Sequence, residues 1–158
     1  MPSPEEVYAL IAHEVGAVWL DGGNTPKGWT ILAHGPSEII TETVDWRVSG
    51  RALSHAAPRD SKAPFHGGCI GYIGYGAGHQ VAPVPQEQSA WEPTLWLGRY
   101  DGGLCFEHET GQWYCTGTKD AQRRGKALLE HAKPLQPPHD ACTATRERTV
   151  DKQDYLED

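Results

Sequence analysis

The sequence predicts an α+β fold, with mostly antiparallel strands in packed sheets and helices flanking them near the two ends. Three observations support this class. Helical periodicity occurs only near the termini, strand-like segments fill the middle, and 18 Gly and 12 Pro separate these segments within 158 residues. Six Trp and six Tyr supply large side chains for a core, which argues against a disordered chain.

The first predicted element is a helix that begins after Ser3. Ser3 is a favourable N-cap, Pro4 suits the first helical position, and Glu6 completes a capping box. Gly16 is expected to end the helix. The apolar residues at helical spacing are Val7, Leu10, Ile11 and Val15.

Strands follow, separated by turns rich in Gly, Pro and Asn. The predicted strands cover residues 17–20, 29–33, 39–48 and 94–100, and residues 51–63 are expected to form a loop. The glycine-rich run 65–78 carries Ile and Tyr between its glycines and lacks a phosphate-binding motif. It is therefore predicted to be a buried, central strand whose glycines, Gly71 among them, let another element pack closely.

Residues 104–108 and 112–117 are predicted to form a hairpin around Thr110 and Gly111. The expected register places Phe106 opposite Cys115. One face then carries Leu104, Phe106, Trp113 and Cys115, and the other face carries Cys105, Glu107, Tyr114 and Thr116. Because Cys105 and Cys115 fall on opposite faces, no disulfide is expected between them. A second helix, with a basic and solvated face, is predicted from Asp120 to Lys133.

The composition excludes several classes of function. The net charge of −7 argues against a nucleic-acid-binding protein. No run approaches the roughly 20 apolar residues of a membrane-spanning helix. The residues after Met1 lack the features of a secretory signal, so a reducing, cytoplasmic location is expected. The four cysteines are then expected to be free thiols.

The search for catalytic and metal-binding motifs finds no complete set of residues. No G-x-S-x-G sequence and no H-x-x-x-H pair occurs. Two His-x-x-Cys pairs, His66 with Cys69 and His139 with Cys142, leave open a small metal-dependent enzyme. Their separation fits no common zinc-binding motif, so neither a metal site nor a catalytic residue is predicted.

Three acidic residues are candidates for a functional role. Asp21, which follows an apolar strand, is expected to cap or turn the chain, with a ligand-binding role as the alternative. Glu107 and Glu109 share one face of a strand near a turn, and both are expected to face solvent rather than to act as an acid–base pair.

Four segments together resemble one enzyme family. Residues 19–22 and 28–36 are similar to the opening "LLDS…GRWSILA..P" of the large subunits of chorismate-using synthases. Residues 64–75, PFHGGCIGYIGY, resemble the more specific "PFxGGxxGYLGYD" segment of these subunits, and residues 99–108 resemble "YDxxLVFDH". Tyr155 and Leu156 stand where these proteins begin their catalytic domain. The families are anthranilate synthase component I and aminodeoxychorismate synthase component I.

The resemblance implies a division of the chain and a function. Residues 1–133 would be the N-terminal domain, 134–148 a linker, and 149–158 the start of a chorismate-binding domain that is otherwise absent. The catalytic residues and the glutamates that bind Mg²⁺ would lie in the absent part, so this chain would need no cofactor and be inactive alone. Its implied partners are that domain and a glutamine amidotransferase subunit.

The resemblance also implies a tryptophan half-site formed by Leu20, Asp21 and Gly22. Asp21 and Gly22, where glutamate and serine occur in feedback-inhibited relatives, favour aminodeoxychorismate synthase of folate synthesis over anthranilate synthase of tryptophan synthesis. The short connection 51–63 also favours aminodeoxychorismate synthase. A free-standing regulatory module that binds an aromatic amino acid is the alternative function.

Overall fold

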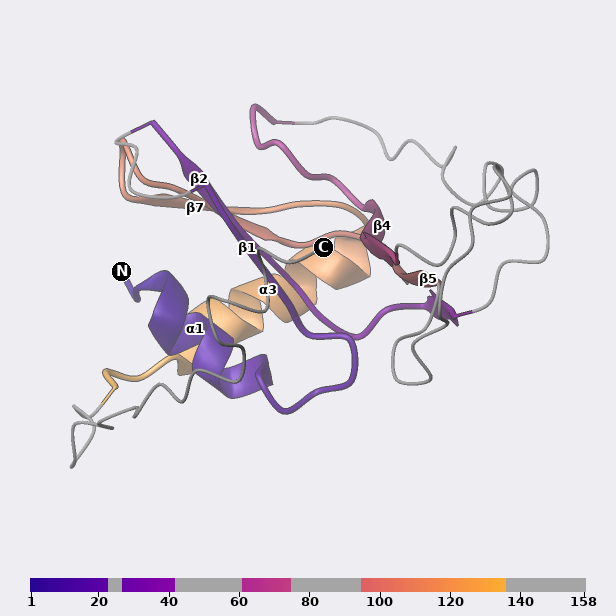
Figure 1. Ribbon diagram of the computed structural model, residues 1–158. Coiled ribbons are helices and arrows are strands. Elements are labelled where there is room, and N and C mark those ends of the chain that lie inside the picture. Colours follow the sequence, from indigo (N-terminus) through magenta and orange to yellow (C-terminus); the bar gives the residue numbers. More distant parts are fainter. Residues whose placement is uncertain (23–26, 42–60, 75–94, 136–158) are drawn as a thin grey trace, which may run out of the picture.

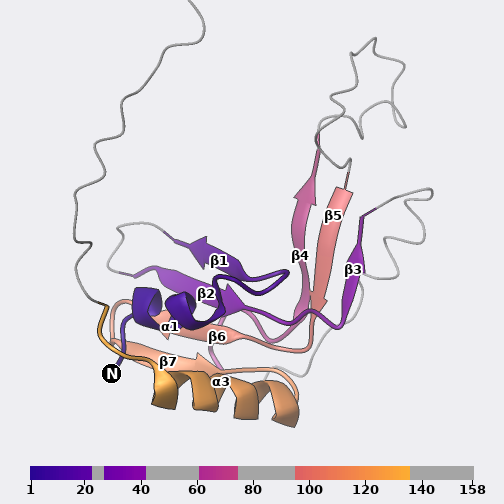
Figure 2. The ribbon, with the colours of Figure 1, turned by 90° about the horizontal axis from the view of Figure 1, so that it is seen from below.

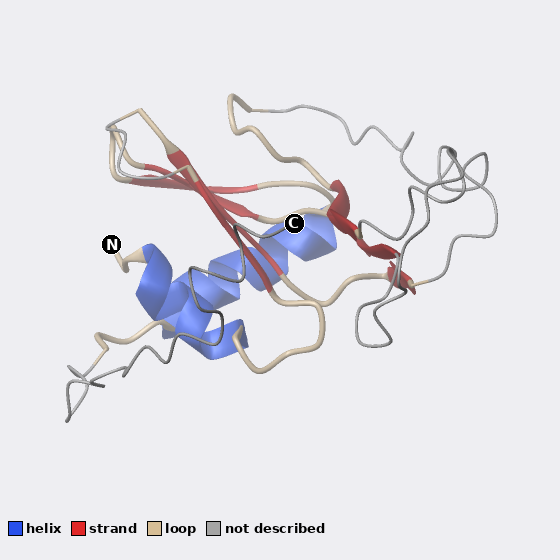
Figure 3. Ribbon diagram, viewed as in Figure 1, coloured by secondary structure: helices blue, strands red, loops and turns tan. Residues whose placement is uncertain are grey.

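The computed structural model describes residues 1–22, 27–41, 61–74 and 95–135 (Figure 1). Within these residues, two helices accompany two antiparallel sheets, with strand orders β1-β2-β6-β7 and β3-β5-β4 (Figure 3). The elements are α1 (Pro4–Ile11), β1 (Val18–Asp21), β2 (Trp29–Ala33), β3 (Glu38–Ile40), β4 (Gly68–Ile73), β5 (Leu95–Tyr100), β6 (Leu104–Glu107), β7 (Gln112–Cys115) and α3 (Lys119–His131). The predicted α+β class is confirmed.

Local sequence signals set the starts of both helices. The Ser3 hydroxyl accepts a hydrogen bond from the Glu6 amide at 3.3 Å, and the Glu6 carboxylate accepts one from the Ser3 amide at 2.8 Å, which confirms the capping box. The helix α1 ends at Ile11, earlier than expected, and Val15 is exposed to solvent. The helix α3 begins at Lys119, one residue before the predicted start at Asp120, and Thr118 is its N-cap.

Both helices lie on one side of the four-stranded sheet (Figure 1). The core between them consists of Val7, Ile11, Leu32 and Leu104, with Trp19, Trp113 and Leu128 packed at its edge. Gly125 allows α3 to approach the sheet closely, because a Cβ atom there would lie 2.9 Å from Leu104 Cδ2. The apolar side of each amphipathic helix therefore faces the sheet.

The β6–β7 hairpin has the predicted faces but a different register. Phe106 pairs with Trp113, two residues away from the expected partner Cys115. The difference arises in the connecting loop, where the Gly111 amide donates to the Glu107 carbonyl at 2.8 Å and Gly111 adopts a φ of +65°. Because a shift of two residues keeps each side chain on its face, the separation of Cys105 and Cys115 is confirmed, and both are free thiols.

The glycine-rich run forms the strand β4 over Gly68–Ile73, but its predicted central and buried position is wrong. The strand β5 is central, and β4 pairs with it at one edge. Tyr72 and Ile73 are 48% and 56% exposed. The packing role of Gly71 is confirmed, because a Cβ atom there would overlap the carbonyl oxygen of Trp96 and lie 2.8 Å from Leu97 Cα.

Several predictions concern residues outside the described ranges. These are most of the strand 39–48, most of the loop 51–63, the end of the run 65–78 and nearly all of the proposed linker and second domain beyond residue 135. The division into domains therefore stays a prediction. Neither helix in the described residues is long and apolar enough to cross a membrane.

Candidate functional site

The three residues of the predicted half-site lie at the end of β1, an edge strand of the four-stranded sheet. Leu20 pairs with Ile31, Asp21 pairs with Thr30, and the Gly22 amide donates to the Trp29 carbonyl at 3.0 Å. Side chains alternate along a strand, so Leu20 and Asp21 point to opposite faces. Leu20, which is 44% exposed, lies on the face away from the helices.

Asp21 lies on the helix-covered face and belongs to a polar cluster with Thr30 and His108. The buried Thr30 hydroxyl donates a long hydrogen bond of 3.5 Å to Asp21 Oδ1, and His108 Nε2 lies 2.8 Å from the same hydroxyl oxygen. His108 Nε2 is also 3.9 Å from Asp21 Oδ1. Asp21 thus interacts across strands with Thr30 and His108.

The opposite face carries a second cluster, centred on Glu107. Lys62 Nζ donates to both carboxylate oxygens of Glu107 at 2.7 and 2.8 Å. The Tyr114 hydroxyl donates to Glu107 Oε2 at 3.4 Å, and the Thr110 hydroxyl makes a further short hydrogen bond to it. The Lys62 ammonium also lies 5.6 Å from the centre of the Tyr114 ring, within reach of a cation–π interaction.

The expectation that Glu107 faces solvent is wrong, because the residue is only 7% exposed. The segment 61–66 crosses this face of the sheet and covers it: Ala63 is buried, and the Cys105 thiol lies 3.6 Å from the Phe65 carbonyl. The hydrogen bond from Lys62 lowers the pKa of Glu107, and the same bond raises the pKa of Lys62. Glu109 is exposed, as expected.

Replacing Glu107 with glutamine is expected to lower the melting temperature at pH 7, because Lys62 loses its anionic partner. In the folded protein the pKa of Glu107 lies below its ordinary value. The stability that the ionised carboxylate contributes is therefore fully present at pH values above the ordinary pKa, and it is lost as the pH falls through the pKa of the folded protein. The difference in melting temperature between the wild type and E107Q should therefore shrink in strong acid. Thermal melts from pH 7 down to pH 2 measure it.

The matched control for this variant is Glu109→Gln, which removes an exposed carboxylate two residues away. It should leave the melting temperature nearly unchanged at every pH, since isolated surface charges contribute little. Equal melting temperatures for E107Q and E109Q at pH 7 would contradict a stabilising role for the Lys62–Glu107 pair.

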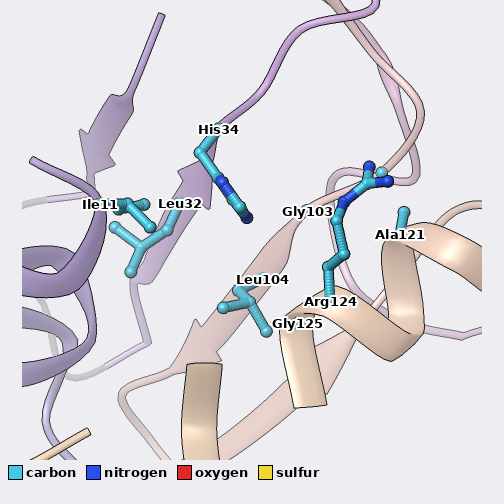
Figure 4. A pocket seen from close by; sticks show the side chains of 9 residues that line it. Ile11, Leu32, His34, Gly103, Leu104, Ala121, Arg124 and Gly125 are labelled. Carbon is cyan, nitrogen blue, oxygen red and sulfur yellow. The ribbon is translucent and has the colours of Figure 1, made fainter. Parts of the chain in front are cut away.

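A small cavity lies between the sheet and α3 (Figure 4). Leu32, Leu104 and Gly125 line it, and the His34 ring and the Arg124 side chain reach its rim. His34 Nδ1 lies 2.7 Å from Glu14 Oε2, which links the end of β2 to the segment after α1. The space of about 10 Å³ holds roughly one water molecule, so this cavity is too small for a substrate.

The outer side of α3 forms a wide, open groove of about 440 Å³ lined largely by polar and basic side chains. Lys119, Arg123 and Lys126 lie along it, and Arg123 pairs with Asp120 at 3.0 Å. This arrangement confirms the predicted solvated, basic face of the second helix. Hydrated surface charges of this kind need no ligand to explain them.

The described residues do not provide a complete metal site. His66 is buried, and its Nε2 lies 2.9 Å from the Ala63 carbonyl, where it acts as a donor rather than as a metal ligand. Cys69 is half-buried. Within these residues, no group of three or more His, Cys, Asp or Glu side chains could hold a metal ion. His139 and Cys142 lie outside the described ranges.

A family model described as chorismate binding enzyme matches residues 17–158. The chain belongs to this family. The fold is also similar to the crystal structure of anthranilate synthase component I from Streptococcus pneumoniae TIGR4, with a TM-score of 0.51 and 20% identity. The match covers 81% of this chain but only 33% of that structure. A comparison with curated proteins gives no match.

These comparisons confirm the family resemblance of the sequence and its fold. This chain spans about a third of the length of the solved relative that it matches. Sequence reasoning identified the residues of β1 but missed Thr30 on the adjoining strand β2 and His108 directly after β6. It also missed the partnership of Lys62 with Glu107, which are 45 residues apart in the chain.

Proposed function

We propose that this chain is the N-terminal, non-catalytic part of the large subunit of a chorismate-using synthase. The family match over residues 17–158 supports a chorismate-using synthase, and the likeness of residues 64–75 to an N-terminal segment of such subunits supports the N-terminal position. Among the described residues, the cavity of about 10 Å³ beneath α3 is too small for a substrate, which supports a structural rather than a catalytic role for this part of the sheet.

The chemistry of the whole enzyme needs groups beyond the described residues. Chorismate carries carboxylates and a leaving hydroxyl, and a bound Mg²⁺ would supply charge stabilisation for both. The described side chains do not fit such an ion, because no three carboxylate, His or Cys groups converge. The proposal therefore assigns Mg²⁺ and the acid–base residues to the remaining part of the enzyme, with a glutamine amidotransferase subunit as the source of ammonia. A cytoplasmic location is proposed for the assembly.

Aminodeoxychorismate is the proposed product, in preference to anthranilate. The preference rests on Asp21 and Gly22, where the resemblance leads one to expect glutamate and serine in enzymes under tryptophan feedback. A Cβ atom at Gly22 would lie 3.1 Å from the Trp29 carbonyl oxygen, so a serine there would require a small shift of the adjoining strand. Because this crowding disfavours a serine at position 22, it supports an enzyme without the serine expected under tryptophan feedback.

The enzyme expressed from the whole reading frame tests the proposal. Incubated with chorismate, Mg²⁺ and ammonia, or glutamine and the amidotransferase, it should consume chorismate and form aminodeoxychorismate, which chromatography detects. Formation of anthranilate, which fluorescence detects, would retain the synthase function and reject the preferred product. A folded enzyme that leaves chorismate unchanged would reject the synthase function.

The proposed tryptophan half-site makes a separate prediction. Leu20→Asp in the whole enzyme is expected to weaken tryptophan binding at least tenfold, because it places a carboxylate on the exposed apolar face of β1. Val15→Asp, at another exposed apolar position, should bind like the wild type. Isothermal titration calorimetry with tryptophan measures both. Equal affinities for the two variants would contradict the half-site, and full affinity in the 158-residue chain alone would favour the free-standing regulatory module.

A further inference from the structure

The three-stranded sheet β3-β5-β4 has no helical layer among the described residues. The helices α1 and α3 pack on β2 and β7 of the other sheet, and Figure 2 shows the three-stranded sheet standing beyond them. A sheet is normally stabilised by burying at least one face against a second layer. The two faces of this sheet differ in charge, which indicates where another layer could pack.

One face of this sheet carries an ion pair and is buried only in its central part, because Ile73 on the same face is 56% exposed. Leu95 and Leu97 are buried there, and Arg99 shares their face and pairs with Glu38 at 3.0 Å. The other face, here called the outer face, carries Ile39, Ile70, Tyr72 and Trp96. Tyr72 lies directly opposite Trp96, and Ile39 and Ile70 flank Gly98. All four side chains are apolar or aromatic, and Ile39 and Tyr72 are 39% and 48% exposed.

One end of the outer face is already closed by the chain itself. Tyr100 folds its ring over Gly98, where a Cβ atom would lie 2.6 Å from the Tyr100 hydroxyl oxygen. That hydroxyl donates to the Gly16 carbonyl at 2.7 Å, which fixes the segment after α1 against this end. Burial raises the pKa of Tyr100 to about 12. Beyond Gly98, the apolar surface continues to Tyr72 and Trp96.

We propose that the outer face docks the remaining part of the chorismate-using enzyme, the two thirds of the solved relative that this chain does not match. The inference rests on the proposed function and names the surface that function requires. Permanent interfaces resemble a protein core, with aromatic residues enriched and charges depleted. The outer face has this composition, whereas the exposed side of α3 is basic and suits contact with water.

Hydroxyl-radical footprinting of two proteins tests the proposal: the 158-residue chain and the enzyme expressed from the whole reading frame. Tyr72 should be oxidised readily in the short chain and at least fivefold more slowly in the whole enzyme. Ile73, which lies on the other face of β4 and is 56% exposed, should be oxidised at the same rate in both. Equal rates for Tyr72 would overturn the proposal. So would protection of Tyr72 in the short chain, whether by its own residues or by a second copy detected in sedimentation.

A pair of variants provides an independent measurement. In the whole enzyme, Tyr72→Glu should accelerate proteolysis between the two parts at least fivefold, because it places a charge in the interface. Ile73→Glu, on the other face of the same strand, is the matched control and should be cleaved like the wild type. Identical cleavage of both variants would contradict the docking surface. These readouts do not depend on chorismate turnover. An inactive enzyme would therefore reject the proposed function but would leave the test of the docking surface intact.

Discussion

Gly71→Val is expected to lower the free energy of unfolding by about 3 kcal/mol, because overpacking at a close backbone approach forces the neighbouring strand to move. The side chain would meet the main chain of Trp96 and Leu97, not a flexible side chain that could rotate away. For a protein of this size, the loss corresponds to a fall in melting temperature of roughly 6–12 °C. Circular dichroism during heating measures it.

Ile73→Val is the matched control for this variant. It also places valine in β4, at a position that is 56% exposed and two residues further along. A conservative change at an exposed site should alter the unfolding free energy by less than about 0.5 kcal/mol. If Gly71→Val melts at the same temperature as Ile73→Val, the close contact between β4 and β5 is not what requires glycine at position 71.

Local interactions explain what the sequence could predict. The capping box of α1 depends on Ser3 and Glu6, which are three residues apart, and β2 has the predicted limits because Trp29–Ala33 lies between clear turn signals. The faces of the β6–β7 hairpin follow from simple alternation. The register does not, because it depends on the hydrogen bond that closes the loop at Gly111.

Long-range packing explains what the sequence could not predict. In the three-stranded sheet, β5 rather than β4 is the central strand, although β4 has the more distinctive sequence. Glu107 was expected to be solvated because its ammonium partner, Lys62, comes from a segment without regular periodicity. The half-site was located on β1 by family resemblance, but only the strand geometry shows that Leu20 and Asp21 belong to opposite faces.

The second large effect concerns catalysis: the 158-residue chain alone is expected to turn over no chorismate. Elimination of the chorismate hydroxyl requires a metal or an equivalent charge and a placed acid or base. Asp21, Thr30 and His108 converge, but Thr30 is buried and its hydroxyl is engaged with both neighbours. Glu107 is held by Lys62 and is covered by the segment 61–66. Neither cluster borders the small cavity described above.

The most direct test of the non-catalytic role is an assay of the purified 158-residue chain with chorismate, Mg²⁺ and ammonia, beside the enzyme from the whole reading frame. A circular dichroism melt first shows that the short chain is folded. The expected result is turnover by the whole enzyme and a rate for the short chain equal to that of buffer. Anthranilate fluorescence, or a chromatographic peak of aminodeoxychorismate, from the short chain alone would contradict its assignment as a non-catalytic part.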